Sequence, residues 1–472
     1  MRACNTLPAF KSCPSEVISV KLFSAHALAA LTLLIAPALF AQQAGPLRAG
    51  AAKVDITPTA AMFPIHQGPQ TLGDVHDPLF ARALVLDNGS SKVLLMDVDT
   101  TGIPNAKEVV QAVSGELKIP ASNISIAITH DHVAPTFGGG RGDRSNIQPY
   151  LDLMKAGIVK AAHDANASLQ PARIGWGAGK AYVNTNRDEK IGPVYHMGYA
   201  PTGPTDKTVA VILLTDAAGK PIAIWSNYAV HGVVMFLSKT RNGMGEVSGD
   251  LPGWTERYVE DHFPGAINIW TSGAAGDQNP LFQSSYNQDA PDMHDEGAAG
   301  YAILDVLSRR LGESIVRTAN SIQNTTGKAV LWAAGATVTC PGRNFVVTQQ
   351  VAAADSAKSP TAGTVEGHME DGPPVDISLH LIMINDIALA NVTGEVFNQI
   401  AQRLKQNSLF DRTAMVTLSN GSIGYIPSDA SYLLPSAMAV HNRIAPGCAE
   451  HKIDDAFLGL EKQYMPIWRA AN

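Results

Sequence analysis

The sequence predicts an α/β protein built on a mixed sheet with flanking helices. Short apolar runs typical of strands alternate along the chain with segments of helical periodicity. The 472 residues are 45% hydrophobic and 16% charged, a composition that supplies a large core and argues against extensive disorder.

Residues 1–41 have the features of a secretory signal peptide. Basic residues precede an apolar run over residues 27–41, which ends in small side chains. The run is short for a membrane span and contains Pro37, so an uncleaved N-terminal anchor is the less favoured alternative. We therefore expect a secreted or periplasmic protein whose mature domain covers residues 46–472.

Strand signals recur along the mature chain. Residues 81–99 contain two apolar runs joined by Asn88-Gly89, a dipeptide typical of hairpin turns. Five further runs have the length and composition of strands, and polar residues follow each of them: 124–128, 221–225, 267–270, 381–392 and 414–418.

Helical signals lie between these runs. Apolar residues recur with helical spacing, or Pro stands in the first turn, in four segments: 106–117, 150–165, 252–262 and 301–319. Residues 350–375, rich in Ala, Gly, Pro and acidic side chains, predict a surface loop or flap. The sequence contains no recognisable internal repeat.

Cysteine usage and charge narrow the function classes. The mature chain keeps only Cys340 and Cys448, which allow one disulfide but no thiolate zinc site. Any metal must therefore be held by His, Asp, Glu or Tyr. The net charge of −7, without a basic block, argues against nucleic acid as a partner.

Titratable side chains follow four of the apolar runs: His130, His231, Glu395 and Tyr425. Ligands of open α/β sheets bind where the carboxyl ends of strands meet, so these residues predict a metal site at that edge. A single histidine after a strand is more often an ordinary hydrogen-bonded residue, and the prediction depends on all four together. In extended backbone, His130 and His132 would point to the same side, with Asp131 opposite and orienting a neighbour.

Several ordered motifs between about residue 48 and residue 440 resemble the neutral/alkaline non-lysosomal ceramidases. The motifs are Val75-His-Asp-Pro-Leu-Phe-Ala-Arg-Ala83, Thr129-His-Asp-His132 before a Gly-rich loop, Asn184 to Arg187, Asp206-Lys207, Asn227-Tyr-Ala-Val-His-Gly232, Ser248-Gly-Asp250, Gly276-Asp-Gln-Asn-Pro280, Thr393-Gly-Glu395 and Asn420-Gly-Ser-Ile-Gly-Tyr-Ile426.

The resemblance implies a role for each candidate site residue. His130, His231, Glu395 and Tyr425 match the ligands of a catalytic Zn²⁺. His132 matches a histidine that contacts the substrate beside the metal, and Arg187 would face the scissile carbonyl or the charge of the transition state. A zinc-activated water would then cleave an amide bond.

Two departures from the family pattern affect the expected substrate. Asn279 occupies the position of a family serine used in ceramide hydrolysis, and an amide can donate a hydrogen bond to an oxyanion but cannot act as a nucleophile. Asn279 therefore joins His132 and Arg187 as an expected catalytic residue with an altered role. The short stretch after Tyr425 also predicts that the family's C-terminal β-sandwich domain is missing.

Together these features predict a ceramidase-like zinc hydrolase that cleaves an amide bond in a small-molecule or lipid-like N-acyl substrate. The alternatives are a related metallohydrolase that acts on an ester or a non-lipid amide, and a catalytically silent ligand-binding protein. A lipid-like substrate would bring the protein into transient contact with a membrane surface. The sequence makes no prediction about oligomeric state.

Overall fold

The computed structural model describes residues 44–67, 70–135, 147–191, 194–286, 294–347, 367–434, 437–440 and 442–471. The predicted signal peptide, residues 1–41, lies outside this part of the chain. Within the described residues, no helix is both long enough and apolar enough to cross a membrane.

The first large sheet has the strand order β7-β6-β5-β2-β8. Strands β2, β5 and β6 are antiparallel to their neighbours. Helix α1 then leads to β7, which is parallel to β6. Helix α2 packs on β2 and β5. The elements are β2 (Arg48–Asp55), β5 (Phe80–Asp87), β6 (Lys92–Val98), α1 (Ala106–Leu117), β7 (Ile124–Ile128), α2 (Gln148–Ala167) and β8 (Gln170–Pro171).

The second large sheet repeats this arrangement in the order β15-β13-β12-β9. Three antiparallel strands come first, and α3 then leads to the parallel strand β15. Helices α3 and α4 pack against each other beside this sheet. The elements are β9 (Arg173–Lys180), β12 (Thr208–Thr215), β13 (Pro221–Tyr228), α3 (Asp250–His262), β15 (Ile267–Ser272) and α4 (Gly300–Ser321).

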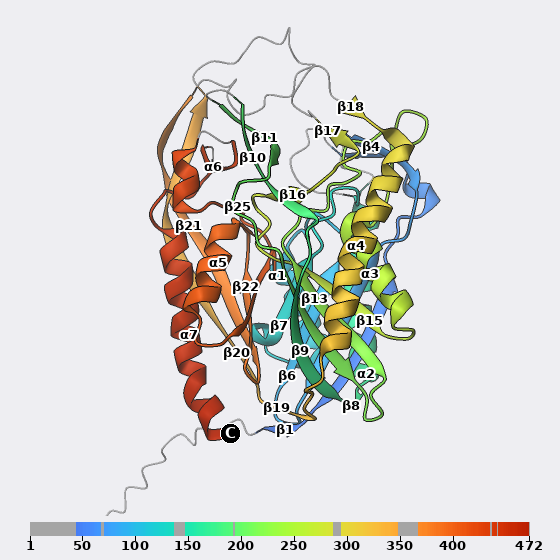
Figure 1. Ribbon diagram of the computed structural model, residues 1–472, viewed down its shortest axis with the longest axis vertical. Helices are drawn as coiled ribbons and strands as arrows, with labels where there is room; N and C mark the ends of the chain where they lie inside the picture. Colours follow the sequence, from blue (N-terminus) through green and yellow to red (C-terminus); the bar gives the residue numbers. More distant parts are fainter. Residues whose placement is uncertain are drawn as a thin grey trace, which may run out of the picture. The chain divides into compact units, whose positions relative to one another are not determined.

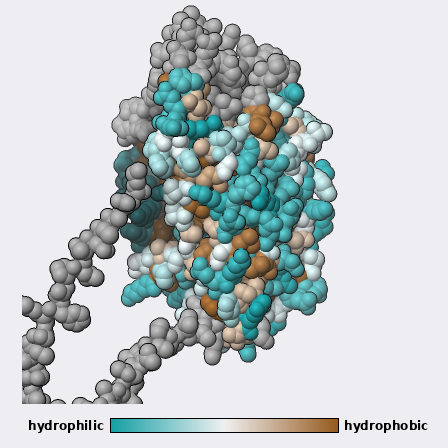
Figure 2. All heavy atoms as spheres, turned by 90° about the vertical axis from the view of Figure 1, so that its left-hand side faces the viewer, coloured by the Kyte–Doolittle hydropathy of each residue, from teal (hydrophilic) through white to brown (hydrophobic). Residues whose placement is uncertain are grey.

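The third large sheet, in the order β20-β21-β22-β24, has the same connections. Strands β20 and β21 form a long antiparallel hairpin, and β22 pairs antiparallel with β21. Helix α5 then leads to β24, which is parallel to β22. The elements are β20 (Leu331–Val347), β21 (Gly367–Ile384), β22 (Ile387–Val392), α5 (Asn398–Asn407), β24 (Arg412–Thr417) and α7 (Ala449–Ala471). Helix α7 buries an apolar stripe against β20 and β21, and the surface on that side is mostly hydrophilic (Figure 2).

Smaller sheets and short helices connect the large sheets. Two sheets have three strands, in the orders β11-β10-β16 and β14-β4-β3, and the remaining strands form pairs. The strands are β1 (Gly45–Pro46), β3 (Ile65–Gln67), β4 (Gln70–Val75), β10 (Asn184–Ile191), β11 (Val194–Ala200), β14 (Gly245–Val247), β16 (Gln278–Pro280), β17 (Ser285–Tyr286), β18 (His294–Asp295), β19 (Lys328–Ala329), β23 (Glu395–Val396) and β25 (Tyr425–Ile426). The helices are η1 (Ala60–Met62), η2 (Ala121–Asn123), η3 (Gly297–Ala299), η5 (Asp429–Leu433) and α6 (Ala437–Val440).

All three large sheets contribute one face to a shared apolar core. Leu84 of β5, Trp225 of β13 and Ile382 of β21 are fully buried in this core. The opposite faces pack against helices, which are α1 and α2 for the first sheet, α3 and α4 for the second, and α5 and α7 for the third (Figure 1). Because central strands such as β6 and β22 are apolar on both sides, burying them requires both the core and the helix layer.

The four predicted helices, the 81–99 hairpin and the mixed sheet architecture with flanking helices are confirmed, although the strands are divided among three large mixed sheets. The apolar run 381–392 is two strands, since the chain turns at Asn385, whose φ is 56°. The predicted loop 350–375 is partly wrong. Residues 367–375 belong to β21 and pair with β20, and the rest of that segment lies outside the described residues.

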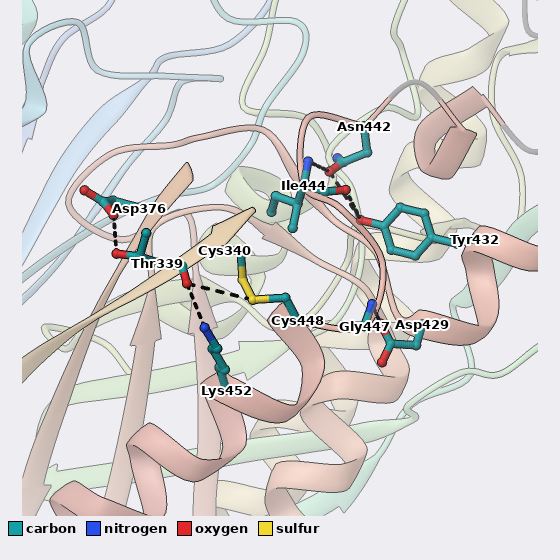
Figure 3. Close-up of a disulfide and its surroundings, with 10 residues drawn as sticks. All are labelled: Thr339, Cys340, Asp376, Asp429, Tyr432, Asn442, Ile444, Gly447, Cys448 and Lys452. Atoms are coloured by element: carbon teal, nitrogen blue, oxygen red, sulfur yellow. Dashed lines mark hydrogen bonds between the residues drawn. A yellow bond between two sulfur atoms is a disulfide. The ribbon is translucent and has the colours of Figure 1, made fainter. Parts of the chain in front are cut away.

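Cys340 and Cys448 form the disulfide that the sequence allowed. The bond joins β20 to the residue just before α7, with the two Cα atoms 5.8 Å apart (Figure 3). Lys452 of α7 adds a hydrogen bond to the Thr339 carbonyl, at 2.9 Å. The disulfide therefore fastens the start of α7 to the third sheet across 108 residues of sequence.

Removing this bond should lower the free energy of unfolding. Closing so long a loop restricts the unfolded chain, and loss of such a disulfide typically costs about 2–5 kcal/mol. We expect a loss in this range for the Cys340→Ala/Cys448→Ala double variant, measured by urea unfolding. Wild type unfolded with reductant is the control. Equal stability of variant and oxidised wild type would contradict the prediction.

Candidate functional site

The segments that carry the predicted histidines lie side by side. His130 follows β7 by two residues, and His231 follows β13 by three. A parallel bridge pairs Asp131 with Gly232, and the backbone N–H of His132 donates to the Gly232 carbonyl at 2.9 Å. The ring centroids of His130 and His231 are consequently 4.5 Å apart.

His130 and His132 face one another, although not for the reason that their spacing suggested. The backbone of His130 has a φ of 59°, in the left-handed region, so the segment is not extended. The Nε2 atoms of the two rings are nevertheless 3.2 Å apart. Non-glycine residues with such φ values cost free energy and concentrate at functional sites, where surrounding contacts maintain them.

Glu395 completes a compact group with His130 and His231. Its Oε2 atom lies 3.2 Å from His130 Nε2 and 3.3 Å from His231 Nε2. Burial alone would raise the pKa of Glu395, but the two imidazoles beside it hold that pKa well below the usual range. Burial lowers the pKa of His231 to about 4. His231 is therefore a neutral imidazole near neutral pH, which is the form of histidine that binds a metal ion.

The hydrogen bonds around these residues fit a metal ion. His231 Nδ1 lies 3.0 Å from the Gln278 carbonyl oxygen, which is an acceptor, so Nδ1 carries the proton and Nε2 presents a lone pair. His231 Nε2 and Glu395 Oε2 are buried without a hydrogen-bond partner. In a tetrahedral zinc site with ligands at about 2.0 Å, neighbouring ligand atoms are about 3.3 Å apart. The separations from Glu395 match this spacing, and so does the 3.2 Å between His130 Nε2 and His132 Nε2, so that His130, His132 and His231 also form a group that could hold a metal ion.

Tyr425 reaches the group through a short strand pairing. Strand β25 pairs in parallel with β23, which places Tyr425 opposite Glu395. Its hydroxyl interacts with Glu395 and Arg187, and the Arg187 guanidinium lies 5.2 Å from the centroid of the tyrosine ring. Burial raises the pKa of Tyr425 to about 12, with Arg187 opposing the rise. The four predicted ligands are therefore neighbours.

Arg187 and Asn279 are brought together by the pairing of β10 with β16. Arg187 Nη1 donates to Asn279 Oδ1 at 3.4 Å, and Nη2 donates to the Gly276 carbonyl. The amide nitrogen of Asn279 donates to Gln283 Oε1 at 3.3 Å. Both residues are almost fully buried. All three predicted catalytic residues thus lie within contact distance of a predicted ligand or of each other.

Three serine hydroxyls close to Asn279 in sequence are hydrogen-bonded to backbone carbonyls. Ser272 donates to the Thr129 carbonyl, Ser284 to that of Gly297 and Ser285 to that of Phe236. None of these three bonds is made to Glu395 or to a histidine side chain.

Sequence reasoning did not identify the side chains that hydrogen-bond to the backbone next to the histidines. Asp250 accepts the backbone N–H groups of Val234 and Met235, at 3.0 and 2.8 Å, and so holds the turn that follows His231. Asp131 was expected to orient a neighbouring side chain, but its Oδ1 accepts the N–H of Val133. Asp250 lies in the Ser248-Gly-Asp250 motif, which signalled this segment but assigned Asp250 no role.

A second group of buried carboxylates, Asp97, Asp99 and Glu256, also escaped the sequence analysis. Arg82 lies among them, with its Nη1 atom 3.1 Å from Asp99 and 2.7 Å from Glu256. Burial raises the pKa of each of these carboxyls, and Arg82 opposes the rise. We interpret this group as an ion-pair network that binds α3 to β5 and β6, because a guanidinium already occupies it.

The comparisons with known proteins bear on the fold. No protein-family model matches the chain. Neutral ceramidase of Pseudomonas aeruginosa is 26% identical over 241 residues, which are 46% of this chain but only 34% of the ceramidase. The crystal structure of the neutral ceramidase from Pseudomonas aeruginosa matches 89% of this chain and 75% of its own, with a TM-score of 0.67 at 16% identity. The chain has a neutral-ceramidase-like fold.

A second solved structure, a ceramidase complexed with C2, matches with a TM-score of 0.65 at 15% identity, over 89% of this chain and 76% of that one. The family resemblance inferred from the sequence motifs is thereby confirmed for the fold. The roles of the individual site residues stay predictions.

Gly276 provides a test of how tightly the site is assembled. A Cβ atom at this position would lie 2.6 Å from the Glu395 carbonyl oxygen, which is a backbone atom and cannot rotate away. We expect Gly276→Ala to lower the free energy of unfolding by about 1–3 kcal/mol, as overpacking does. Chemical denaturation provides the measurement.

Gly459, inside α7, is the matched control, because a Cβ there meets nothing within 4 Å. Gly459→Ala should leave stability unchanged or raise it by up to about 1 kcal/mol, since alanine favours helix. Destabilisation of similar size in both variants would show that the Gly276 contact is not the cause.

Proposed function

We propose that this chain is a zinc-dependent hydrolase that cleaves an amide bond in a lipid-like N-acyl substrate. The observation that carries the proposal is the position of Glu395 Oε2, at 3.2 and 3.3 Å from one nitrogen each of His130 and His231. Burying an unpaired carboxylate and two imidazoles is costly, and a divalent cation between them would remove that cost.

Four residues would hold the ion at the carboxyl ends of the strands: His130, His231, Glu395 and Tyr425. Zinc bound there would polarise a carbonyl oxygen and lower the pKa of a water molecule. The Gln278 carbonyl would keep the His231 ring oriented, and Asp250 would hold the following turn. The geometry of the ligands is then set before substrate arrives.

Three further residues would act on the substrate. His132, whose Nε2 lies 3.2 Å from that of His130, would contact the substrate beside the ion. Arg187 carries a permanent positive charge and would stabilise negative charge on the reacting carbonyl oxygen. Asn279, which accepts a hydrogen bond from Arg187, would place its amide near the same oxygen.

The ceramidase-like fold favours a lipid-like N-acyl compound as the substrate class, with transient contact at a membrane surface. The apolar run at residues 27–41 supports export of the protein. Asn279 in place of the family serine favours a second candidate, a metallohydrolase of an ester or a non-lipid amide. A silent binding protein would keep the site without turnover.

A screen of N-acyl and ester substrates with purified mature protein tests these candidates. The proposal predicts turnover of an N-acyl compound that a chelator abolishes and zinc restores. Turnover of esters alone would favour the second candidate. Stoichiometric zinc without any turnover would favour the silent binding protein, and turnover insensitive to chelator would contradict the metal mechanism.

Replacing the histidines one at a time should separate ligands from substrate contacts. His130→Ala and His231→Ala should lose bound zinc and activity, because each removes a ligand, whereas His132→Ala should keep zinc and lose activity. Elemental analysis after dialysis against zinc measures the metal. The control is His163→Ala, which alters an exposed ion pair with Glu116. Loss of zinc from His132→Ala but not from His130→Ala would reverse the assignment.

Asn279→Ala should reduce turnover by about 10²–10³ if the amide donates to the developing oxyanion. A loss below about threefold would place the residue outside the reacting centre. Asn268→Ala is the control, since this equally buried amide pairs with Ser226 in the second sheet. Asn279→Ser should raise hydrolysis of long-chain ceramide if this loop alone limits it. If ceramide hydrolysis does not increase while zinc stays bound, another part of the pocket limits the reaction.

A further inference from the structure

One buried carboxylate, that of Asp277, joins separate segments of the site. Its Oδ1 accepts the backbone N–H of Asn398 at 2.8 Å, and its Oδ2 accepts the side-chain amide of Asn186 at 2.9 Å. Its own carbonyl oxygen accepts the backbone N–H of Arg187 at 3.0 Å. Asp277 is only 3% exposed, so these protein groups replace water as its partners.

The Asn398 backbone N–H and the Asn186 side-chain amide both depend on the Asp277 carboxylate as their hydrogen-bond acceptor. Asn398 is the first residue of α5, where backbone N–H groups have no acceptor within the helix and negative charge is favoured. The other side-chain contacts of Asn186 are already used, because its amide also donates to the Pro204 carbonyl and its Oδ1 accepts the N–H of Asp188. Asn186 therefore offers no obvious replacement for the bond to Asp277.

These contacts fix two functional groups relative to each other. Arg187 follows Asn186 directly, and Glu395 precedes α5 by three residues. Next to Asp277, the N–H of Gly276 donates to the Val396 carbonyl at 2.9 Å. The separation between the Arg187 guanidinium and the Glu395 carboxylate thus depends on the loop around Asp277.

We propose that Asp277 is a positioning residue, which holds Arg187 and Glu395 in the relative placement that the reaction requires. It acts through the two segments that it binds and does not itself touch the substrate. The inference rests on the proposed hydrolase function, and its test includes readouts that do not depend on turnover.

The sharpest variant is Asp277→Asn, which keeps the size and shape of the side chain. Both partners of Asp277 are hydrogen-bond donors, whereas an amide offers one acceptor and one donor group. The variant can therefore satisfy Asn398 or Asn186 but not both. If it fails to fold, Asp277→Ser provides a second variant that shortens the side chain and releases both partners.

Glu461→Gln is the matched control. The Glu461 carboxylate is 1% exposed and likewise accepts one side-chain donor, the Ser408 hydroxyl, and one backbone N–H, that of Leu409, each at 2.7 Å. It links α7 to the segment after α5 and has no contact with Arg187, Glu395 or the histidines among its described bonds. Its replacement should lower stability to a similar degree without altering the site.

Hydrogen–deuterium exchange of the metal-free proteins gives the first readout. Asp277→Asn should speed exchange in peptides covering residues 184–188 and 395–400 by about threefold or more, and Glu461→Gln should do so only around residues 408–410. Unchanged exchange at 184–188 and 395–400 in every Asp277 variant would overturn the proposal, whatever the activity.

Steady-state kinetics on the zinc-loaded proteins give the second readout. We expect kcat to fall by about tenfold or more in Asp277→Asn, with KM nearly unchanged, because misplacement of reacting groups slows turnover. Glu461→Gln should keep kcat within about twofold. Faster exchange with unchanged kcat would assign Asp277 a structural role only and overturn the proposal.

A third readout separates this proposal from the proposed function. If wild type hydrolyses no N-acyl substrate, the proposed function is wrong. Titration with Co²⁺, followed by absorption, then tests whether Asp277 holds Glu395 in place for metal binding. Asp277→Asn should bind Co²⁺ about tenfold more weakly than wild type and Glu461→Gln, as loss of a supporting contact does. Equal Co²⁺ affinity in all three proteins would overturn the proposal on its own.

Discussion

The shared apolar core of three β-sheets holds together the segments that carry three of the candidate ligands. Side chains such as Leu84, Trp225 and Ile382 come from different sheets and fill one interior volume. Because protein cores are close-packed, a shared core leaves little freedom for one sheet to move relative to another. The loops that follow β7, β13 and β22 are therefore held near one another, and they carry His130, His231 and Glu395.

The candidate site buries several polar side chains. His130, His231, Arg187 and Asn279 are all below a tenth exposed. Burying polar groups costs free energy unless they have partners, and several partners here are backbone groups of neighbouring loops, such as the Gln278 and Gly276 carbonyls. Several buried atoms lack a hydrogen-bond partner among the described residues, and two of them, His231 Nε2 and Glu395 Oε2, lie where a cation would bind.

The likeness to ceramidases is stronger in the fold than in the sequence. Most of the chain superimposes on the solved ceramidase at 16% identity, whereas the sequence match covers less than half of it. Apolar patterns that build the three sheets can change residue by residue while volume and polarity are kept. Fold likeness at this level of identity therefore leaves the substrate class to be argued from the side chains of the site.

Local patterns in the sequence determined much of the secondary structure and the chemistry of the site. The bounds of α1 and β7 follow from apolar periodicity, and the histidines, Glu395 and Tyr425 stand out because each follows a strand-like run. Cys340 and Cys448 were identified as the single candidate pair. These features depend on a few neighbouring residues, so a linear pattern contains them.

Only the tertiary structure decided how these pieces meet. The sequence did not divide the strands among three sheets, because apolar runs do not specify their partners. It also did not reveal the left-handed backbone of His130, the pairing of β10 with β16 that joins Arg187 to Asn279, or the bonds from Asp277 to Asn186 and Asn398. Each of these depends on contacts between residues far apart in the chain, which form only when the sheets close around their common core.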